Sequence, residues 1–177
     1  MKAKQTLLAI TCMAVLLMSG CSTAPNNTND TDTNSTTTPQ QEKAPFNLGE
    51  TWTVDGQWTL TINSAVATEE RNEYSDKKPA AVYIVDYTYT NIGYEDEDGI
   101  MDGLFISIED SIVDNAGTMG YSYPGDITNH PKETPVGATC NAQACIGVDN
   151  AGNFTLNVIQ YDGNGKKQSA KFNIEAQ

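Results

Sequence analysis

Residues 46–177 are predicted to form an all-β domain, an antiparallel β-sandwich of about seven to eight strands. Apolar and polar residues alternate with a period of two along this region. Clusters of glycine, asparagine and aspartate separate the alternating segments, and such clusters are typical of turns. No segment carries apolar residues at helical spacing over three turns. Many short strands with frequent turns indicate a sandwich.

The strands are expected in a regular order along the chain. Residues 51–54 lead into Asp55-Gly56, a pair typical of a type I′ hairpin turn, and residues 58–62 alternate as the next strand. Residues 81–90 are β-branched and aromatic on both faces, as expected of a central strand. Further strands are predicted at residues 104–113, 138–148, 154–161 and 170–174.

Three tyrosines, Tyr83, Tyr87 and Tyr89, share one face of the expected central strand. A row of aromatic side chains packs in the core or forms an exposed platform for a carbohydrate or a peptide. Packing in the core is the commoner arrangement, and the sequence leaves both interpretations open.

The N-terminus has the pattern of a bacterial lipoprotein signal. Lys2 and Lys4 precede an apolar stretch at residues 7–18, which is too short to span a bilayer as a helix. Small residues then precede Cys21, and this segment resembles a lipobox. The resemblance implies a signal peptide at 1–20 and a diacylglyceryl group on the sulfur of Cys21. Such a group anchors a protein to the extracytoplasmic face of the cell membrane. An ordinary secretory signal is the alternative.

Residues 22–45 are rich in threonine, asparagine and proline and contain no large apolar side chain. Such a segment cannot bury enough surface to offset its ordering entropy, so we expect a disordered tether. Its root-mean-square reach is about 25–30 Å. The predicted organisation is a signal peptide at 1–20, the lipidated cysteine and tether at 21–45, and one domain at 46–177.

The composition excludes several classes of function. The 177 residues include 10 Lys+Arg and 23 Asp+Glu, a net charge of -13, which argues against binding of nucleic acid. The single histidine, His130, cannot furnish a multi-histidine metal site. No pair of a nucleophile and a general base can be assembled around it, so the sequence favours a protein that is not an enzyme.

An acidic segment follows the expected central strand and contains Glu95, Asp96, Glu97, Asp98 and Asp102. Ca2+ takes six to eight oxygen ligands, which such loops supply. The spacing does not fit the twelve-residue EF-hand loop. Two interpretations stay open: an exposed acidic loop that keeps the domain soluble, and a weak Ca2+ site.

Cys140 and Cys145 form a Cys-x4-Cys pair. In a continuous strand, residues five apart point to opposite faces and lie about 16 Å apart, beyond the reach of a disulfide. A turn or bulge between them would bring the sulfur atoms together, and an oxidising compartment outside the membrane would favour their pairing. We expect a disulfide, with two unpaired thiols as the alternative.

Tyr121 and Tyr123 stand in a segment that continues with proline and glycine. Binding residues often lie on loops that a rigid scaffold holds in place, and exposed aromatic side chains are common contact points. This loop is therefore a candidate for an exposed aromatic contact with a partner, and a loop without a binding role is the alternative.

Four short motifs occur in the predicted domain: Leu48-Gly49-Glu50-Thr51, residues 58–65, residues 83–91, and Pro135 with Gly137. Together they resemble the bacterial lipoprotein family called domain of unknown function 4352. The resemblance implies an immunoglobulin-like sandwich, related to the fold of immunoprotective extracellular antigens, and a Gram-positive type of cell surface. That family has no established common activity, so the resemblance passes no catalytic residue to this chain.

The sequence therefore favours a lipid-anchored cell-surface protein with a non-enzymatic binding or accessory role. Its partners would be the membrane, through the acylated Cys21, and another surface protein or a wall component. The alternative is an extracellular module that binds Ca2+ or a small ligand through residues 95–102. The first interpretation needs no cofactor, whereas the second needs Ca2+.

Overall fold

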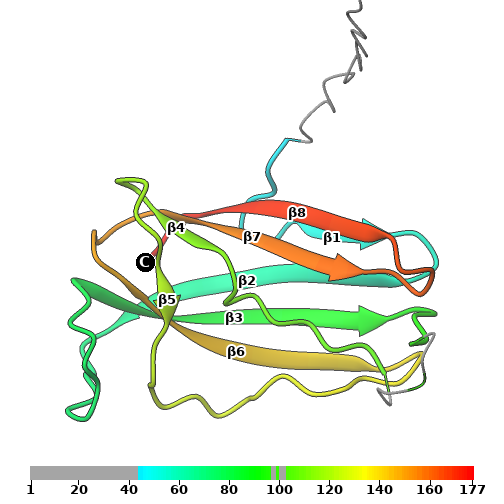
Figure 1. Ribbon diagram of the computed structural model, residues 1–177, viewed down its shortest axis with the longest axis horizontal. Coiled ribbons are helices and arrows are strands. Elements are labelled where there is room, and N and C mark those ends of the chain that lie inside the picture. Colours follow the sequence, from blue (N-terminus) through cyan, green and yellow to red (C-terminus); the bar gives the residue numbers. More distant parts are fainter. Residues whose placement is uncertain (1–43, 97–98, 100–102) are drawn as a thin grey trace, which may run out of the picture. The chain divides into compact units, whose positions relative to one another are not determined.

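The computed structural model describes residues 44–96, 99 and 103–177 (Figure 1). The described part contains eight β-strands and no helix, so no helix in it has the length and hydrophobicity that a membrane span requires. One sheet has the order β1-β2-β3-β6-β5 and the other the order β4-β7-β8. All strand pairs are antiparallel, which confirms the predicted β-sandwich. The strands are β1 (Thr51–Val54), β2 (Trp58–Thr68), β3 (Ala81–Asn91), β4 (Ile112–Asp114), β5 (Tyr121–Ser122), β6 (Thr139–Val148), β7 (Phe154–Tyr161) and β8 (Lys167–Ile174).

The order of the strands is that of an immunoglobulin-like sandwich. The strands β2-β3-β6-β5 correspond to the A-B-E-D sheet of an immunoglobulin constant domain, and β4-β7-β8 correspond to its C-F-G sheet. Strand β1 adds an extra edge beside β2. The chain crosses between the sheets after β3, β4 and β6, which produces the two packed layers in Figure 1.

Two segments outside the named strands cover the edges of the sheets. Phe46 lies beside β8, where its N–H donates to the carbonyl of Lys171 at 2.8 Å and its own carbonyl accepts from the N–H of Asn173 at 2.7 Å. Gln177 lies beside the second half of β2, where its N–H donates to the carbonyl of Ala65 at 3.0 Å. These contacts pair backbone groups that an open edge would offer to another chain.

The core lies between the two sheets, and the central strand β3 supplies its largest side chains. Tyr83, Tyr87 and Tyr89 are only 4%, 1% and 0% exposed, so the core interpretation is correct and the aromatic platform is wrong. Trp58 and Phe172 complete the centre of this core from the first and last long strands. Burial of aromatic side chains supplies much of the hydrophobic stabilisation of such a domain.

Residues 104–113 were predicted as one strand, but only their last two residues belong to β4. Leu104, Ile106 and Ile108 do alternate and are buried, as the sequence pattern suggests. Of these three, Leu104 pairs with Thr134 in an isolated bridge, and the segment joins no ladder in the described part of the chain. Alternation therefore predicts which side chains are buried here, whereas strand pairing depends on a neighbour that sequence does not reveal.

The predicted disulfide between Cys140 and Cys145 is wrong. Strand β6 runs unbroken through both residues, so their side chains point to opposite faces. Cys140 belongs to the core between the sheets, and Cys145 packs with Val82 and Tyr123 on the outer side of the larger sheet. Both thiols are free, as the alternative of a continuous strand predicted.

Candidate functional site

The predicted lipidation and metal sites fall largely outside the described residues. Cys21 lies outside them, as do Glu97, Asp98 and Asp102 of the acidic segment. Within the part that the structure describes, no group of three or more His, Cys, Asp or Glu side chains could hold a metal ion. Lipidation and Ca2+ binding therefore both stay predictions.

The predicted aromatic loop is not an exposed binding loop. Tyr123 is 4% exposed, and its hydroxyl accepts a hydrogen bond of 2.9 Å from the N–H of Asn72. Tyr121 is half-buried in β5, where its hydroxyl donates to Asp149 at 3.1 Å and the ammonium of Lys77 lies 4.9 Å from its ring centroid. Burial and the bond to Asp149 raise the pKa of Tyr121 to about 12. Both rings are engaged by their own domain.

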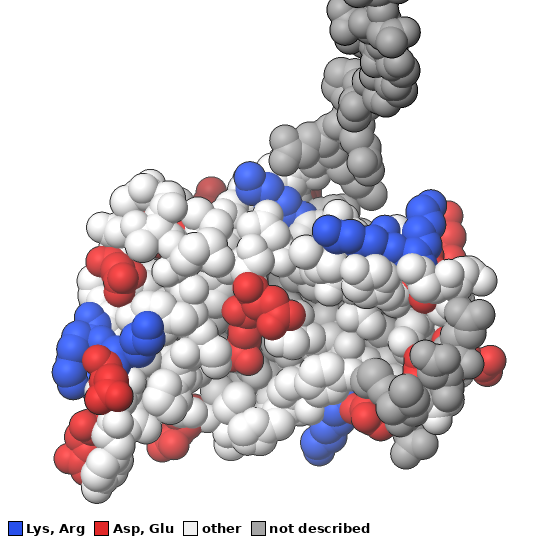
Figure 2. Space-filling view, in the orientation of Figure 1, with Lys and Arg blue, Asp and Glu red and all other residues white. Residues whose placement is uncertain are grey.

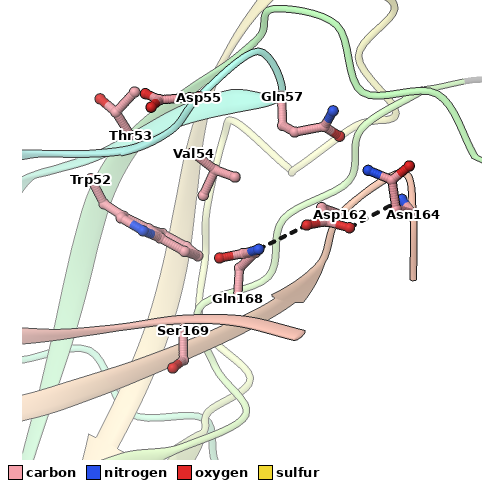
Figure 3. Close-up of a pocket in the computed structure, with 9 residues that line it drawn as sticks. All are labelled: Trp52, Thr53, Val54, Asp55, Gln57, Asp162, Asn164, Gln168 and Ser169. Atoms are coloured by element: carbon pink, nitrogen blue, oxygen red, sulfur yellow. Dashed lines mark hydrogen bonds between the residues drawn. The ribbon is translucent and has the colours of Figure 1, made fainter. Parts of the chain in front are cut away.

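A polar hollow of about 400 Å³ lies between β1 and the turn that joins β7 to β8 (Figure 3). Its polar side chains hold this turn in place: Gln57 accepts from the N–H of Gly163 at 3.0 Å, and Gln168 donates to Asp162 at 2.7 Å. Trp52 is only 3% exposed and offers a ligand almost no aromatic surface. The lining residues are Trp52, Thr53, Val54, Asp55, Gln57, Asp162, Asn164, Gln168 and Ser169.

Asp162 organises the tip of the β7–β8 hairpin and is not free to act on a ligand. Besides the bond from Gln168, its carboxylate accepts hydrogen bonds of 3.0 Å from the N–H groups of Asn164 and Lys166. The bond from Gln168 and these N–H groups hold the pKa of Asp162 below its ordinary value. The hollow therefore marks the contact between the β1–β2 turn and the β7–β8 turn, which a hydrogen bond between them stabilises.

The outer face of the larger sheet carries a regular array of hydroxyl groups that the sequence analysis missed. We call it the threonine face. It is formed by two rows of side chains that cross β1, β2, β3 and β6, and strands in such a sheet lie about 4.7–4.9 Å apart. One row contains Thr53, Thr59, Thr90 and Thr139, and the other contains Thr51, Thr61, Thr88 and Asn141.

Hydrogen bonds across the strands order the threonine face. The hydroxyls of Thr51 and Thr61 lie 2.8 Å apart, and Thr88 donates to the side-chain oxygen of Asn141 at 2.9 Å. None of the eight side chains carries a charge, although the chain as a whole has a net charge of -13. The face therefore presents ordered, uncharged donors and acceptors on an otherwise acidic protein.

A recurring Thr-x-Thr pattern is the sequence signal for this face. It occurs at residues 51–53, 59–61 and 88–90, and residues 139–141 give Thr-x-Asn. Threonine also favours strands for its β-branched shape, so each copy alone indicates only a strand. The four copies become one surface because the strand register aligns them, and the register is a long-range property.

No protein-family model matches this chain, and no curated protein matches it. Among solved structures, the chain is similar to the crystal structure of the YjhA protein from Bacillus subtilis, with a TM-score of 0.47 and 15% sequence identity. The likeness covers 73% of this chain and 99% of that chain. It is too distant to add to the description of the fold or the function.

Proposed function

We propose that this protein is a lipid-anchored lipoprotein of the bacterial cell surface with a non-enzymatic binding or accessory role. The threonine face is the observation that supports this role. It is a broad area of the domain where uncharged donors and acceptors repeat at the spacing of the strands. Binding through such a face needs no cofactor and no catalytic group.

The anchor in this proposal is Cys21, carrying the lipid that the lipobox resemblance implies. Residues 22–45 then give the domain a reach of about 25–30 Å from the membrane surface. The immunoglobulin-like order of the strands agrees with the family resemblance, domain of unknown function 4352, which we keep as part of the proposal. A domain held in this way meets surface proteins and wall polymers rather than substrates inside the cell.

The partner in this proposal is an uncharged surface, either of another cell-surface protein or of a wall glycan. A charged partner would lose hydration on docking without gaining an ion pair from the threonine face. Hydroxyl and amide groups on the partner, in contrast, exchange hydrogen bonds with water for hydrogen bonds with threonine. The ordered rotamers of the face lower the entropy lost on binding.

The test is capture of partners on intact cells, with the anchored protein as bait. A photo-crosslinker on the threonine face, in place of Thr61, is compared with one on the outer face of the smaller sheet, in place of Thr155. We expect capture from the threonine face, and its loss when Thr59 and Thr88 are both replaced by lysine. A Thr155→Lys variant is the matched control. Capture that the double substitution leaves unchanged would refute this role for the face.

Capture of one protein would identify an accessory subunit, and sedimentation with isolated cell walls would identify a wall glycan as the partner. The anchor is tested separately, because Cys21→Ser should move the protein from the membrane fraction to the soluble fraction. Retention of this variant in the membrane would count against acylation.

A further inference from the structure

Lysine side chains gather on the outer face of the smaller sheet and in the turn that precedes it, beside two exposed apolar side chains. Lys167 and Lys171 belong to the outer face of β8, and Lys166 lies in the turn just before β8. Three of the seven Lys and Arg residues in the described part are Lys166, Lys167 and Lys171. Ile159 and Tyr161 lie on the same face of the neighbouring strand and are 45% and 56% exposed. Tyr161 stands directly opposite Lys167 in the register. We call these five residues the lysine face.

The charge of this face contrasts with the rest of the molecule. In Figure 2, blue side chains gather along the upper margin of the domain, where Figure 1 places β8. Among the described residues, these three amines form no ion pair, although Lys166 helps to lower the pKa of the nearby Asp162. The three amines stand on a chain whose net charge is -13. Their gathering indicates an anionic partner.

The chain segment that precedes the domain ends at this same strand. Phe46 lies against β8 between Lys171 and Asn173, with a hydrogen bond to each backbone. Residues 22–45 therefore join the domain at the edge of the strand that carries the lysines.

We propose that the lysine face rests on an anionic phospholipid surface, the surface into which Cys21 is anchored. This inference rests on the proposed lipid anchor. Lysines next to a membrane are attracted to anionic headgroups, and tyrosine is favoured at the boundary between headgroups and acyl chains because one end of it is apolar and the other polar. Because the two outer faces of a sandwich point in opposite directions, this contact turns the threonine face away from the membrane.

The contact is strong enough to orient a tethered domain. Each lysine close to an anionic leaflet strengthens association with it about fivefold, so three lysines contribute on the order of a hundredfold. The attraction is screened over about 8–10 Å at 0.1–0.15 M salt. The orientation should therefore depend on anionic lipid and weaken as salt is raised.

The test measures how fast each lysine of the acylated, full protein reacts with an amine-acetylating reagent on vesicles. The vesicles contain phosphatidylcholine alone or equal amounts of phosphatidylcholine and phosphatidylglycerol, and mass spectrometry follows each site. We expect phosphatidylglycerol to slow acetylation of Lys167 and Lys171 severalfold at low salt, and high salt to remove the effect. Lys77, Lys78 and Lys132 lie outside the lysine face and serve as internal controls with unchanged rates.

A pair of matched variants sharpens the result. Replacing both Lys167 and Lys171 by glutamine should abolish the protection of Lys166, whereas replacing both Lys77 and Lys78 by glutamine should leave it intact. Equal rates on both kinds of vesicle would overturn the proposal. Protection by soluble poly(glycerol phosphate), without protection by phosphatidylglycerol vesicles, would also overturn it and identify a phosphate polymer as the ligand.

Failure of this inference is distinguishable from failure of the proposed function. A protein without a lipid anchor would not float with vesicles of phosphatidylcholine alone. An anchored protein whose lysine face points elsewhere would float and show unprotected lysines. Capture through the threonine face is measured independently of both outcomes.

Discussion

Asn150 donates a hydrogen bond of 2.7 Å from its side chain to Asp114, and this bond joins the end of β4 to the connection between β6 and β7, 36 residues further along the chain. The N–H of Asn150 reaches the same oxygen at 3.0 Å. The other oxygen accepts from the N–H groups of Ala116 and Thr118 at 3.0 and 2.8 Å. Burial alone would raise the pKa of Asp114, but these hydrogen bonds outweigh it and hold the pKa below its ordinary value.

Replacing Asp114 by asparagine should lower the melting temperature by several degrees at neutral pH, because an amide cannot accept all four hydrogen bonds. The folded state has the lower pKa, so the stabilisation is present above the unfolded value of about 3.9 and is lost as the pH falls below it. The difference between variant and native protein should therefore shrink below about pH 4. Melting curves from pH 2 to 7 measure it, with Asp126→Asn on an exposed loop as the control. A constant difference would contradict this role.

The two thiols should be unpaired and slow to react in the folded protein. Cys140 and Cys145 face opposite sides of β6, and burial, with smaller contributions from Glu109 and Glu70, raises the pKa of Cys145 to about 11. We expect iodoacetamide at pH 8 to leave both thiols unmodified in the native domain and to label both in denaturant. Mass spectrometry of the unreduced peptide checks this, since a mass lower by two hydrogens would show a disulfide.

Alkaline pH should destabilise the protein through its buried tyrosines. Burial raises the pKa of Tyr89 to about 12. The pKa of Tyr87 is also raised, mainly by burial and to a smaller extent by the charge of Tyr89. The stabilisation is complete below the unfolded value of about 10 and is lost as the pH rises from there toward the folded pKa. Denaturant unfolding between pH 8 and 12 should show this loss, together with phenolate absorbance.

Tyr87→Phe isolates one of these groups. The hydroxyl of Tyr87 donates to the carbonyl of Ile106 at 3.1 Å, so the variant should lose about 1 kcal/mol of unfolding free energy at pH 7. Its stability should then fall less steeply than that of the native protein above pH 10. Tyr74→Phe is the control, because Tyr74 is 87% exposed. If the stability of both variants fell equally steeply above pH 10, Tyr87 would not control the loss of stability at alkaline pH.

Local sequence patterns predict most of the strands here, because alternation along one chain segment decides which side chains are buried. The alternation of Leu104, Ile106 and Ile108 correctly predicts that their side chains are buried. It wrongly predicts that the segment is a strand, since a strand needs a partner with which to pair. The same limit explains the threonine face: Thr59 and Thr88 are 29 positions apart in the chain, and only the register of β2 and β3 brings their rows together. The hairpin turn predicted at Asp55-Gly56 is present but is one residue longer. Val54 pairs with Trp58, so Gln57 also belongs to the turn, which has three residues.

The acidic segment should bind Ca2+ too weakly to stabilise the domain. Its spacing does not fit the twelve-residue EF-hand loop, which arranges six to eight oxygen ligands around Ca2+. We expect the melting temperature to be the same in millimolar Ca2+ and in excess chelator. A rise with Ca2+ that disappears when Glu97 and Asp98 are replaced by Gln and Asn would establish the metal-binding alternative.

Gly147 of β6 allows the ring of Tyr121 to lie across the sheet. A Cβ atom at this glycine would stand 2.7 Å from Cε2 of Tyr121, closer than van der Waals contact allows. Gly147→Ala should therefore displace the ring, break its hydrogen bond to Asp149, and cost about 1–3 kcal/mol of unfolding free energy. Chemical denaturation measures the cost.

A double-mutant cycle distinguishes this contact from a general effect of alanine in the strand. If the ring causes the cost, Gly147→Ala should be nearly neutral when Tyr121 is already alanine, which gives a coupling energy of about 1–3 kcal/mol. Additive effects of the two substitutions would mean that the ring can move aside freely. Outside this ring, Pro79 supplies the nearest atom, 3.3 Å from the added Cβ, and would then be the neighbour that opposes the larger side chain.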